Sequence, residues 1–394
     1  MKLGLFHQVG HNSNWNIESL TEDNCGDGLI LSPVNQSMRA VEKLKDTVKS
    51  KSFFDPQFYL PSSKKSKLST YPFFPETIAD GFSTTDFLSV ADESAKQCVA
   101  FQINQRFKAV IIPARFFDQM YPDYTDRQDA MTVKPFIKSI RKYRTRPPVF
   151  LTLPVTSHMV QHADYRTMLL NWVTSFPEVD GIYVIFNHER STKQIQDADF
   201  LVNLLHFLSE IKQADLQLLV GCLNTESLLL GLLGDIDVAF GTFENTRRFS
   251  IDKFVKSDED IRGPRPRIYL NGLLNWVRFD QAKLIKKNAP ELWSKIYQPT
   301  TYAEHVFAAA VEPHFTQPHL YKHHLLTLAS QFDELKAEAN YSGVLKKLNK
   351  WLSEAKENYA EIAEIPIELD VHGGDGHITP WVQAIKTYHQ QTHK

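Results

Sequence analysis

The sequence is poor in cysteine, and it has neither a long apolar run nor an excess of charge of one sign. Its 394 residues include three cysteines, Cys25, Cys98 and Cys222, and no CxxC pair. This pattern argues against a disulfide framework and against a cysteine-rich zinc site. The formal net charge is −2, so any surface that binds nucleic acid must be a local feature.

Two further absences concern membranes and secretion. No uncharged apolar run reaches the length of about 18 residues that a spanning helix needs. The first residues, MKLGLFHQVGHNSNW, bring in His and Asn before the apolar core of a signal peptide could form. We therefore expect a cytoplasmic protein without a membrane partner. A hydrophobic fraction of 42% and a charged fraction of 23% are typical of a globular fold.

Short apolar runs alternate with helical patterns over the first 280 residues. Such alternation is typical of a parallel sheet whose two faces are covered by helices. Eight repeats in about 250 residues match a (β/α)8 TIM-type barrel. No GxGxxG follows the first run, which argues against a doubly wound sheet. The predicted strands are 28–33, 53–59, 109–117, 149–155, 181–188, 216–224, 237–245 and 267–276.

The pattern becomes helical after Asp280, so we predict a barrel over residues 1–280 and a helical C-terminal region over 281–394. The segment 344–352 has an amphipathic stripe, which indicates a helical cap or an oligomerisation module that binds a protein partner or a second copy of the chain. The tract VHGGDGH at 371–377 is interpreted as a turn. His372, Asp375 and His377 are its metal-ligand types, but we predict no metal and no cofactor.

The carboxyl ends of the strands build the active site of a parallel barrel, so polar residues there are the candidates. Asp55, Glu189 and Glu244 are candidate catalytic carboxylates, whose pKa values neighbours can tune. Arginines suit a phosphate or carboxylate group, and amides suit a heterocycle or sugar hydroxyls. The alternative for Arg247 is that it caps the strand or bridges to Glu244. The candidate substrate-binding residues are Gln57, Arg115, Asn187, His188, Asn224, Asn245, Arg247 and Asn271.

The segment 218–249, LLVGCLNTESLLLGLLGDIDVAFGTFENTRRF, resembles the late barrel of the tRNA-guanine transglycosylases and their DNA 7-deazaguanine relatives. The shared order is a strand with a small-residue turn, a short helix, an aliphatic–Gly–Asp link, a strand and a Thr-Arg pair. The resemblance implies a barrel enzyme that displaces a base through a covalent enzyme–sugar intermediate, with Asp55 contacting the purine. Two features depart from the family: its nucleophilic Asp falls at Gly241, and its zinc cluster has no counterpart.

A basic stretch, KPFIKSIRKYRTR at 134–146, contains no acidic residue. Such a stretch can neutralise phosphates even when the whole chain is not basic, and a solvated helix face is the alternative. Smaller basic clusters lie at 64–67 and 262–267. The candidate nucleic-acid contacts are Lys134, Lys138, Arg141, Lys142, Arg144 and Arg146.

Three functions stay open from the sequence alone. The leading hypothesis is a transglycosylase-like barrel enzyme that acts on a nucleobase or nucleotide, within DNA or RNA or free, by carboxylate-assisted glycosidic chemistry. The second is a non-catalytic barrel subunit of a nucleic-acid-processing or anti-phage complex. The third is a metal-independent hydrolase or lyase of a small metabolite.

Overall fold

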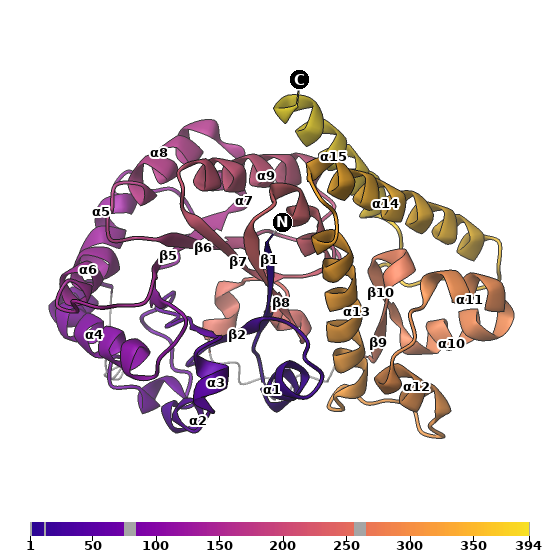
Figure 1. The fold of residues 1–394 in the computed structure, drawn as a ribbon, viewed down its shortest axis with the longest axis horizontal. Coiled ribbons are helices and arrows are strands. Elements are labelled where there is room, and N and C mark those ends of the chain that lie inside the picture. Colours follow the sequence, from indigo (N-terminus) through magenta and orange to yellow (C-terminus); the bar gives the residue numbers. More distant parts are fainter. Residues whose placement is uncertain (1, 12, 75–83, 256–264, 394) are drawn as a thin grey trace.

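Eight parallel strands form one sheet that curves into a nearly closed barrel (Figure 1). The computed structural model describes residues 2–11, 13–74, 84–255 and 265–393, with the backbone alone for 84–87. The sheet order is β3-β2-β1-β8-β7-β6-β5-β4, and its two ends approach where the Lys108 amide donates to the Ser52 carbonyl at 2.9 Å. The predicted TIM-type barrel is confirmed. Its strands are β1 (Leu3–Gln8), β2 (Gly28–Leu31), β3 (Phe53–Phe54), β4 (Val110–Ile112), β5 (Val149–Thr156), β6 (Gly181–Asn187), β7 (Gln217–Leu223) and β8 (Ile236–Gly241).

Two of the strand assignments made from the sequence are wrong, although the total of eight is right. The first barrel strand is β1, which pairs with both β2 and β8 and which the sequence interpretation did not include. The predicted last strand, 267–276, is outside the barrel. It forms an antiparallel hairpin of β9 (Arg267–Leu270) and β10 (Asn275–Arg278). The chain reverses at Leu274, whose φ of 51° is left-handed.

Helices cover the outside of the barrel, and more of them follow it. The helices that precede the hairpin are α1 (Asn14–Thr21), α2 (Met38–Glu42), α3 (Asp46–Lys49), α4 (Thr84–Asn104), α5 (Tyr124–Gln128), α6 (Lys134–Ile140), α7 (Ser157–Gln161), α8 (Ala163–Val173) and α9 (Ala198–Gln213). Those after it are α10 (Phe279–Asn288), α11 (Pro290–Ile296), α12 (Thr301–Ala308), α13 (His319–Lys336), α14 (Tyr341–Ala363) and α15 (Ile378–Thr392). Within the described residues, none has both the length and the hydropathy that crossing a bilayer requires.

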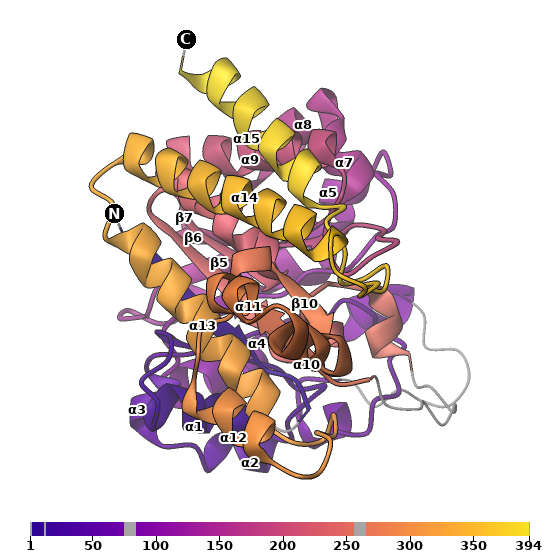
Figure 2. The same cartoon turned by 90° about the vertical axis from the view of Figure 1, so that its right-hand side faces the viewer.

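The C-terminal helices pack against the barrel and its hairpin (Figure 2). Helix α13 contacts β1, α1 and β9, so it lies between the barrel and the hairpin. Helix α14 packs on the 3-10 helix η3 (Thr225–Leu233), and α15 packs on α9. The amphipathic stripe of α14 is buried in these contacts, since Val344, Leu348 and Leu352 are at most 2% exposed. The stripe that suggested a protein partner therefore packs largely against the chain itself.

Aromatic and aliphatic side chains fill the part of the lumen near the amino ends of the strands. Phe6 and Phe53 pack edge to face with their ring centroids 5.1 Å apart, and the Lys108 ammonium lies 4.5 Å from the centre of the Phe6 ring. This filling is expected of an eight-stranded barrel, whose interior is a packed core. The carboxyl ends of the strands are therefore the place for a site.

Three histidines are buried where α13 packs on the barrel and hairpin. His7, His323 and His324 are 0% exposed. The ring of His324 lies 4.2 Å from that of Trp276, and His323 Nε2 lies 2.9 Å from the Tyr269 carbonyl oxygen. Burial lowers the pKa of His7 and of His323 to about 4, and it places that of His324 well below the ordinary value.

We predict that acid weakens this packing. The unfolded chain protonates these histidines below about pH 6.5, whereas the folded chain keeps His7 and His323 neutral to about pH 4 and keeps His324 neutral well below its ordinary pKa, so stability is lost as the pH falls below about 6.5. Each histidine contributes up to about 1.4 kcal/mol per pH unit. Urea unfolding at pH 7.5 and 5.0 measures the loss, and His324→Phe should reduce it. A change in unfolding free energy between the two pH values that is the same in His324→Phe as in the parent protein contradicts the prediction.

Candidate functional site

Asp55 lies in the lumen directly after β3, as the sequence predicts. The residue is 2% exposed. One of its carboxylate oxygens accepts a hydrogen bond from the backbone N–H of Gln57 at 3.0 Å, and the other accepts one from the Tyr59 hydroxyl at 2.9 Å. Burial raises the pKa of Asp55 to about 7, although these hydrogen bonds and one from Tyr183 oppose the rise. Asp55 is therefore suited to take up or release a proton near neutral pH.

Strand β6 brings Tyr183 to the same level of the lumen. The Tyr183 hydroxyl donates to Gln8 Oε1 at 3.4 Å, and the residue is 0% exposed. Gly221 on β7 makes room for it, because a Cβ there would lie 2.6 Å from the Tyr183 ring. The next residue, Cys222, has a left-handed φ of 57° at the register shift between β7 and β8. The end of β7 is thus shaped around the tyrosine next to Asp55.

Aromatic rings close the lumen over Asp55. The rings of Phe249 and Phe254 lie 5.0 and 5.3 Å from that of Tyr59, and Phe116 lies 5.2 Å from Phe249. Tyr59, Phe249 and Phe254 are each at most 3% exposed, so a planar heterocycle can stack on these rings only after they move apart. Access to Asp55 requires that the segment 249–254 shifts.

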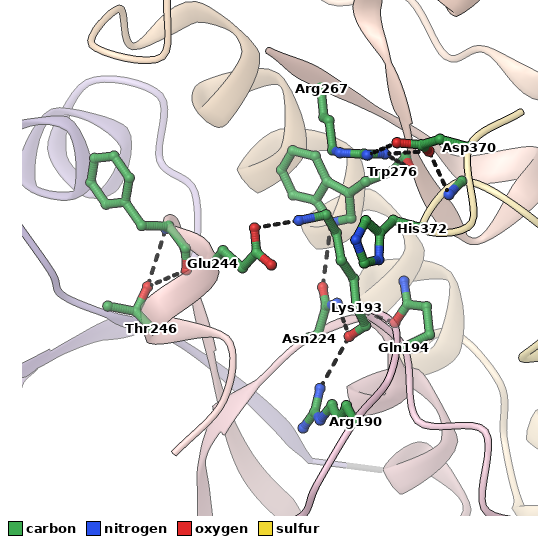
Figure 3. Close-up of polar contacts among 12 residues, drawn as sticks. Arg190, Lys193, Gln194, Asn224, Glu244, Thr246, Arg267, Trp276, Asp370 and His372 are labelled. Carbon is green, nitrogen blue, oxygen red and sulfur yellow. Dashed lines mark hydrogen bonds and ion pairs between the residues drawn. The ribbon is translucent and has the colours of Figure 1, made fainter. Parts of the chain in front are cut away.

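A second group of charged residues lies at the mouth of the barrel, on the segments that follow β6, β7 and β8 (Figure 3). Arg190 and Glu226 form an ion pair at 3.2 Å, and each of their side chains is 2% exposed. Lys193 binds the carboxylate of Glu244, whose side chain is 49% exposed. One pair is therefore fixed by burial, while the other has a side that faces solvent. Asn224 and Arg247 lie beside these pairs, and Trp276 of β10 contacts both of them. We call these seven residues the mouth cluster: Arg190, Lys193, Asn224, Glu226, Glu244, Arg247 and Trp276.

Glu244 is an anion at neutral pH. Burial raises its pKa, but the hydrogen bond and charge of Lys193 and the charge of Arg247 more than offset burial, so the pKa lies below the ordinary value. Burial also lowers the pKa of Lys193, and Glu244 partly offsets that effect. A carboxylate in this state does not serve as a general acid.

Arg247 is buried against Trp276. Its guanidinium carbon lies 4.0 Å from the centre of the indole ring, and the residue is 7% exposed. Burial lowers the pKa of Arg247 to about 10, so it remains a cation. Its Nε and Nη1 meet no hydrogen-bond acceptor among the described residues. The indole Nε1 donates to Asn224 Oδ1 at 3.3 Å.

The turn at 370–377 borders the mouth cluster (Figure 3). Asp370 binds Arg267 at 3.1 Å between Oδ1 and Nη1, and Asn275 Nδ2 donates to the carbonyls of His372 and Gly374 at 3.2 and 3.0 Å. Burial lowers the pKa of His372, and the charge of Lys193 lowers it further. The glycine-rich tract is a turn, as the sequence predicts, and the described residues contain no group of three or more His, Cys, Asp or Glu placed to hold a metal.

The structure brings several predicted site residues together. Asn224, Glu244 and Arg247 line one small cavity of about 20 Å³ with Arg190, Thr192, Lys193 and Arg248. Asp55 and Gln57 lie deeper, and the charges of Asp55 and Arg190 both act on the Cys222 thiol. Asp55 and Glu244 thus belong to two levels of the carboxyl end and do not line the same cavity.

The other predicted residues are placed apart from the mouth cluster. His188 Nδ1 lies 2.7 Å from the Ser157 hydroxyl and its ring stacks on Phe200 at 4.3 Å, while Asn187 ends β6 and accepts from Ser157 through its carbonyl at 3.4 Å. Glu189 and Asn245 are exposed. Arg115 is buried and donates to the Phe58 carbonyl at 2.8 Å. Asn271 lines a separate cavity of about 440 Å³ between α13 and α14.

The basic stretch 134–146 lies on the outer surface, and most of its basic residues form ion pairs with acidic residues from other parts of the chain. Four of its six basic residues form ion pairs: Lys134 with Asp129, Lys138 with Asp92, Arg141 with Glu178 and Arg146 with Asp180. Lys142 and Arg144 are exposed. Because β5 begins at Val149, Arg146 lies at the amino end of the barrel, opposite the mouth cluster. Residues 262–264 of another basic cluster lie outside the described residues.

Several residues of the site escaped the sequence interpretation. Trp276 and His372 come from the hairpin and from the C-terminal turn, and no local pattern links either to the barrel mouth. A signal did exist for Tyr183. Successive side chains of a strand point to opposite faces, so Tyr183 and Asn187, which are four residues apart on β6, share one face.

Comparisons with known proteins give this chain no relative. Neither a family model, nor a curated protein, nor a solved structure matches it.

Proposed function

We propose that this protein is a barrel enzyme that cleaves or exchanges the glycosidic bond of a nucleobase in a nucleotide or polynucleotide, with Asp55 as its proton-transfer group. The observation that carries the proposal is the carboxyl of Asp55, which is 2% exposed and held in the lumen by Gln57 and Tyr59; burial raises its pKa to about 7. Burying an ionisable carboxyl is costly, and no cation appears among the groups that set its pKa. Groups of this kind cluster at functional sites.

The chemistry fits the surroundings of Asp55. When the bond between the sugar C1′ and the base nitrogen breaks, its electron pair goes to the base, which leaves more easily once protonated. A protonated Asp55 supplies that proton, and water or an incoming base bonds to C1′. The aromatic rings of Tyr59, Phe249 and Phe254 supply faces for stacking, and Gln57, whose Oε1 has no partner among the described residues, supplies an amide for the base edge.

Asp55→Asn should abolish this activity while the fold persists. Proton transfer by a positioned side chain contributes about 10²- to 10⁴-fold to rate, so we expect a loss of at least about 100-fold. The assays are release of free base from RNA, DNA and nucleotides, and incorporation of labelled guanine or 7-deazaguanine.

A matched carboxylate variant, Glu354→Gln on the exposed face of α14, is the control and should keep full activity. Tyr59→Phe adds a second test, because the Tyr59 hydroxyl lowers the pKa of Asp55. Its removal should move the pH profile of kcat/KM to higher pH. An Asp55→Asn enzyme that is as active as the parent protein removes Asp55 from the mechanism.

The same substitution should stabilise the protein at alkaline pH. The pKa of Asp55 is raised from 3.8 to about 7, so the stability that its neutral form contributes below pH 3.8 is lost as the pH rises through 7. Asparagine does not ionise. We expect Asp55→Asn to raise the free energy of unfolding at pH 8 by up to about 4 kcal/mol, with little gain at pH 4. Denaturant titrations of both proteins at the two pH values measure this, and equal stability at pH 8 contradicts it.

A further inference from the structure

We infer that the mouth cluster is a binding site for a phosphate monoester, and that the Glu244 carboxylate stands in the place the phosphate takes. The inference concerns binding at the barrel mouth and holds whether or not Asp55 transfers a proton. It rests on three features: unsatisfied donors, an exchangeable carboxylate and an excess of positive charge.

The unsatisfied donors belong to Arg247. The side chain is buried, and two of its nitrogens lack an acceptor among the described residues. Leaving a buried donor unpaired costs about 1–3 kcal/mol, and more when the group is charged. Stacking on Trp276 holds the guanidinium plane in one orientation, which is the pre-organisation that bidentate recognition of phosphate uses. Arg247 is one of the residues that line the cavity of about 20 Å³.

The exchangeable group is Glu244. The cavity holds roughly one water molecule, so an anion as large as phosphate enters only if a lining group leaves. Arg190 and Glu226 are fixed, since both side chains are 2% exposed. Glu244 has a side chain that is 49% exposed, so it can turn to solvent and release Lys193. An incoming phosphate then takes the place of the Glu244 carboxylate on Lys193. It also accepts hydrogen bonds from Nε and Nη1 of Arg247, which have no acceptor among the described residues.

The charge of the site selects the ligand. Arg190, Lys193, Arg247 and Arg248 line the cavity with Glu244 as its acidic residue, while Glu226 neutralises Arg190. When Glu244 has turned away, the lining keeps three uncompensated cations. A doubly charged monoester matches this excess better than a singly charged diester or carboxylate. The position agrees with the fold, because phosphate sites of TIM-type barrels often lie on the loops after the last two strands.

The test is calorimetric titration of the whole protein with inorganic phosphate, a nucleoside 5′-monophosphate and a dinucleoside phosphodiester. We expect saturable binding of phosphate and the monophosphate, and at least about tenfold weaker binding of the diester. Glu244→Gln should tighten phosphate binding several-fold, because the competing charge is gone. Lys193→Gln and Arg247→Gln should weaken it about tenfold or more.

Lys287→Gln, an exposed change on α10, is the control for loss of a positive charge and should leave affinity unchanged. Glu244 is half exposed, so its variant tests the inference even if Arg247→Gln fails to fold. The inference is overturned if Glu244→Gln binds phosphate no better than the parent protein, or if the parent protein binds none. Asp55→Asn should bind phosphate normally, which separates failure of this inference from failure of the proposed chemistry.

Discussion

The packing of Trp276 joins the mouth of the barrel to the hairpin and to α13. This single side chain, 1% exposed, lies against the Arg247 guanidinium beyond β8, donates to Asn224 beyond β7, and contacts His324 on α13. Without the indole, the buried guanidinium of Arg247 loses the ring on which it stacks, and Asn224 Oδ1 loses the donor Nε1 of Trp276. The mouth cluster therefore depends on the hairpin, because the barrel strands alone do not supply the surface that holds Arg247.

Two buried charged residues, Asp55 and Arg247, lie at the carboxyl end of the barrel. Rings such as those of Phe6 and Phe53 close the lumen near the amino ends of the strands. Asp55 and Arg247 lie near or beyond the carboxyl ends of the strands. Each of these two charged groups is more costly to bury than an apolar residue of similar size. A protein that only had to be stable would not keep both. The burial of these two groups is the physical reason to propose a function at the carboxyl end of the barrel.

The sequence predicted the barrel because buried parallel strands appear as continuous apolar runs. The same signal could not separate a barrel strand from the hairpin at 267–278, since periodicity does not report the direction of pairing. The apolar run of strand β1 ends after Phe6 in the polar residues His7 and Gln8, so it was not recognised. The sequence could place Asp55, Asn224 and Arg247 at the carboxyl end of the barrel because residues that follow parallel strands gather at that end. Lys193 and Trp276 act through long-range packing, of which a single sequence carries no trace.

The position of Gly241 sets a limit on the proposed chemistry. A Cβ at this position would lie 2.3 Å from the Thr246 carbonyl carbon and hydroxyl, so no side chain fits where the transglycosylases that the sequence resembles have their nucleophile. Glu244, the nearest alternative, is bound by Lys193. The covalent enzyme–sugar intermediate that the resemblance implies therefore has no carboxylate to form on at position 241. We propose that the glycosidic cleavage, which is itself a proposal, is then a single displacement, in which water or an incoming base attacks C1′ directly. Such a step inverts the configuration at C1′, whereas two displacements retain it.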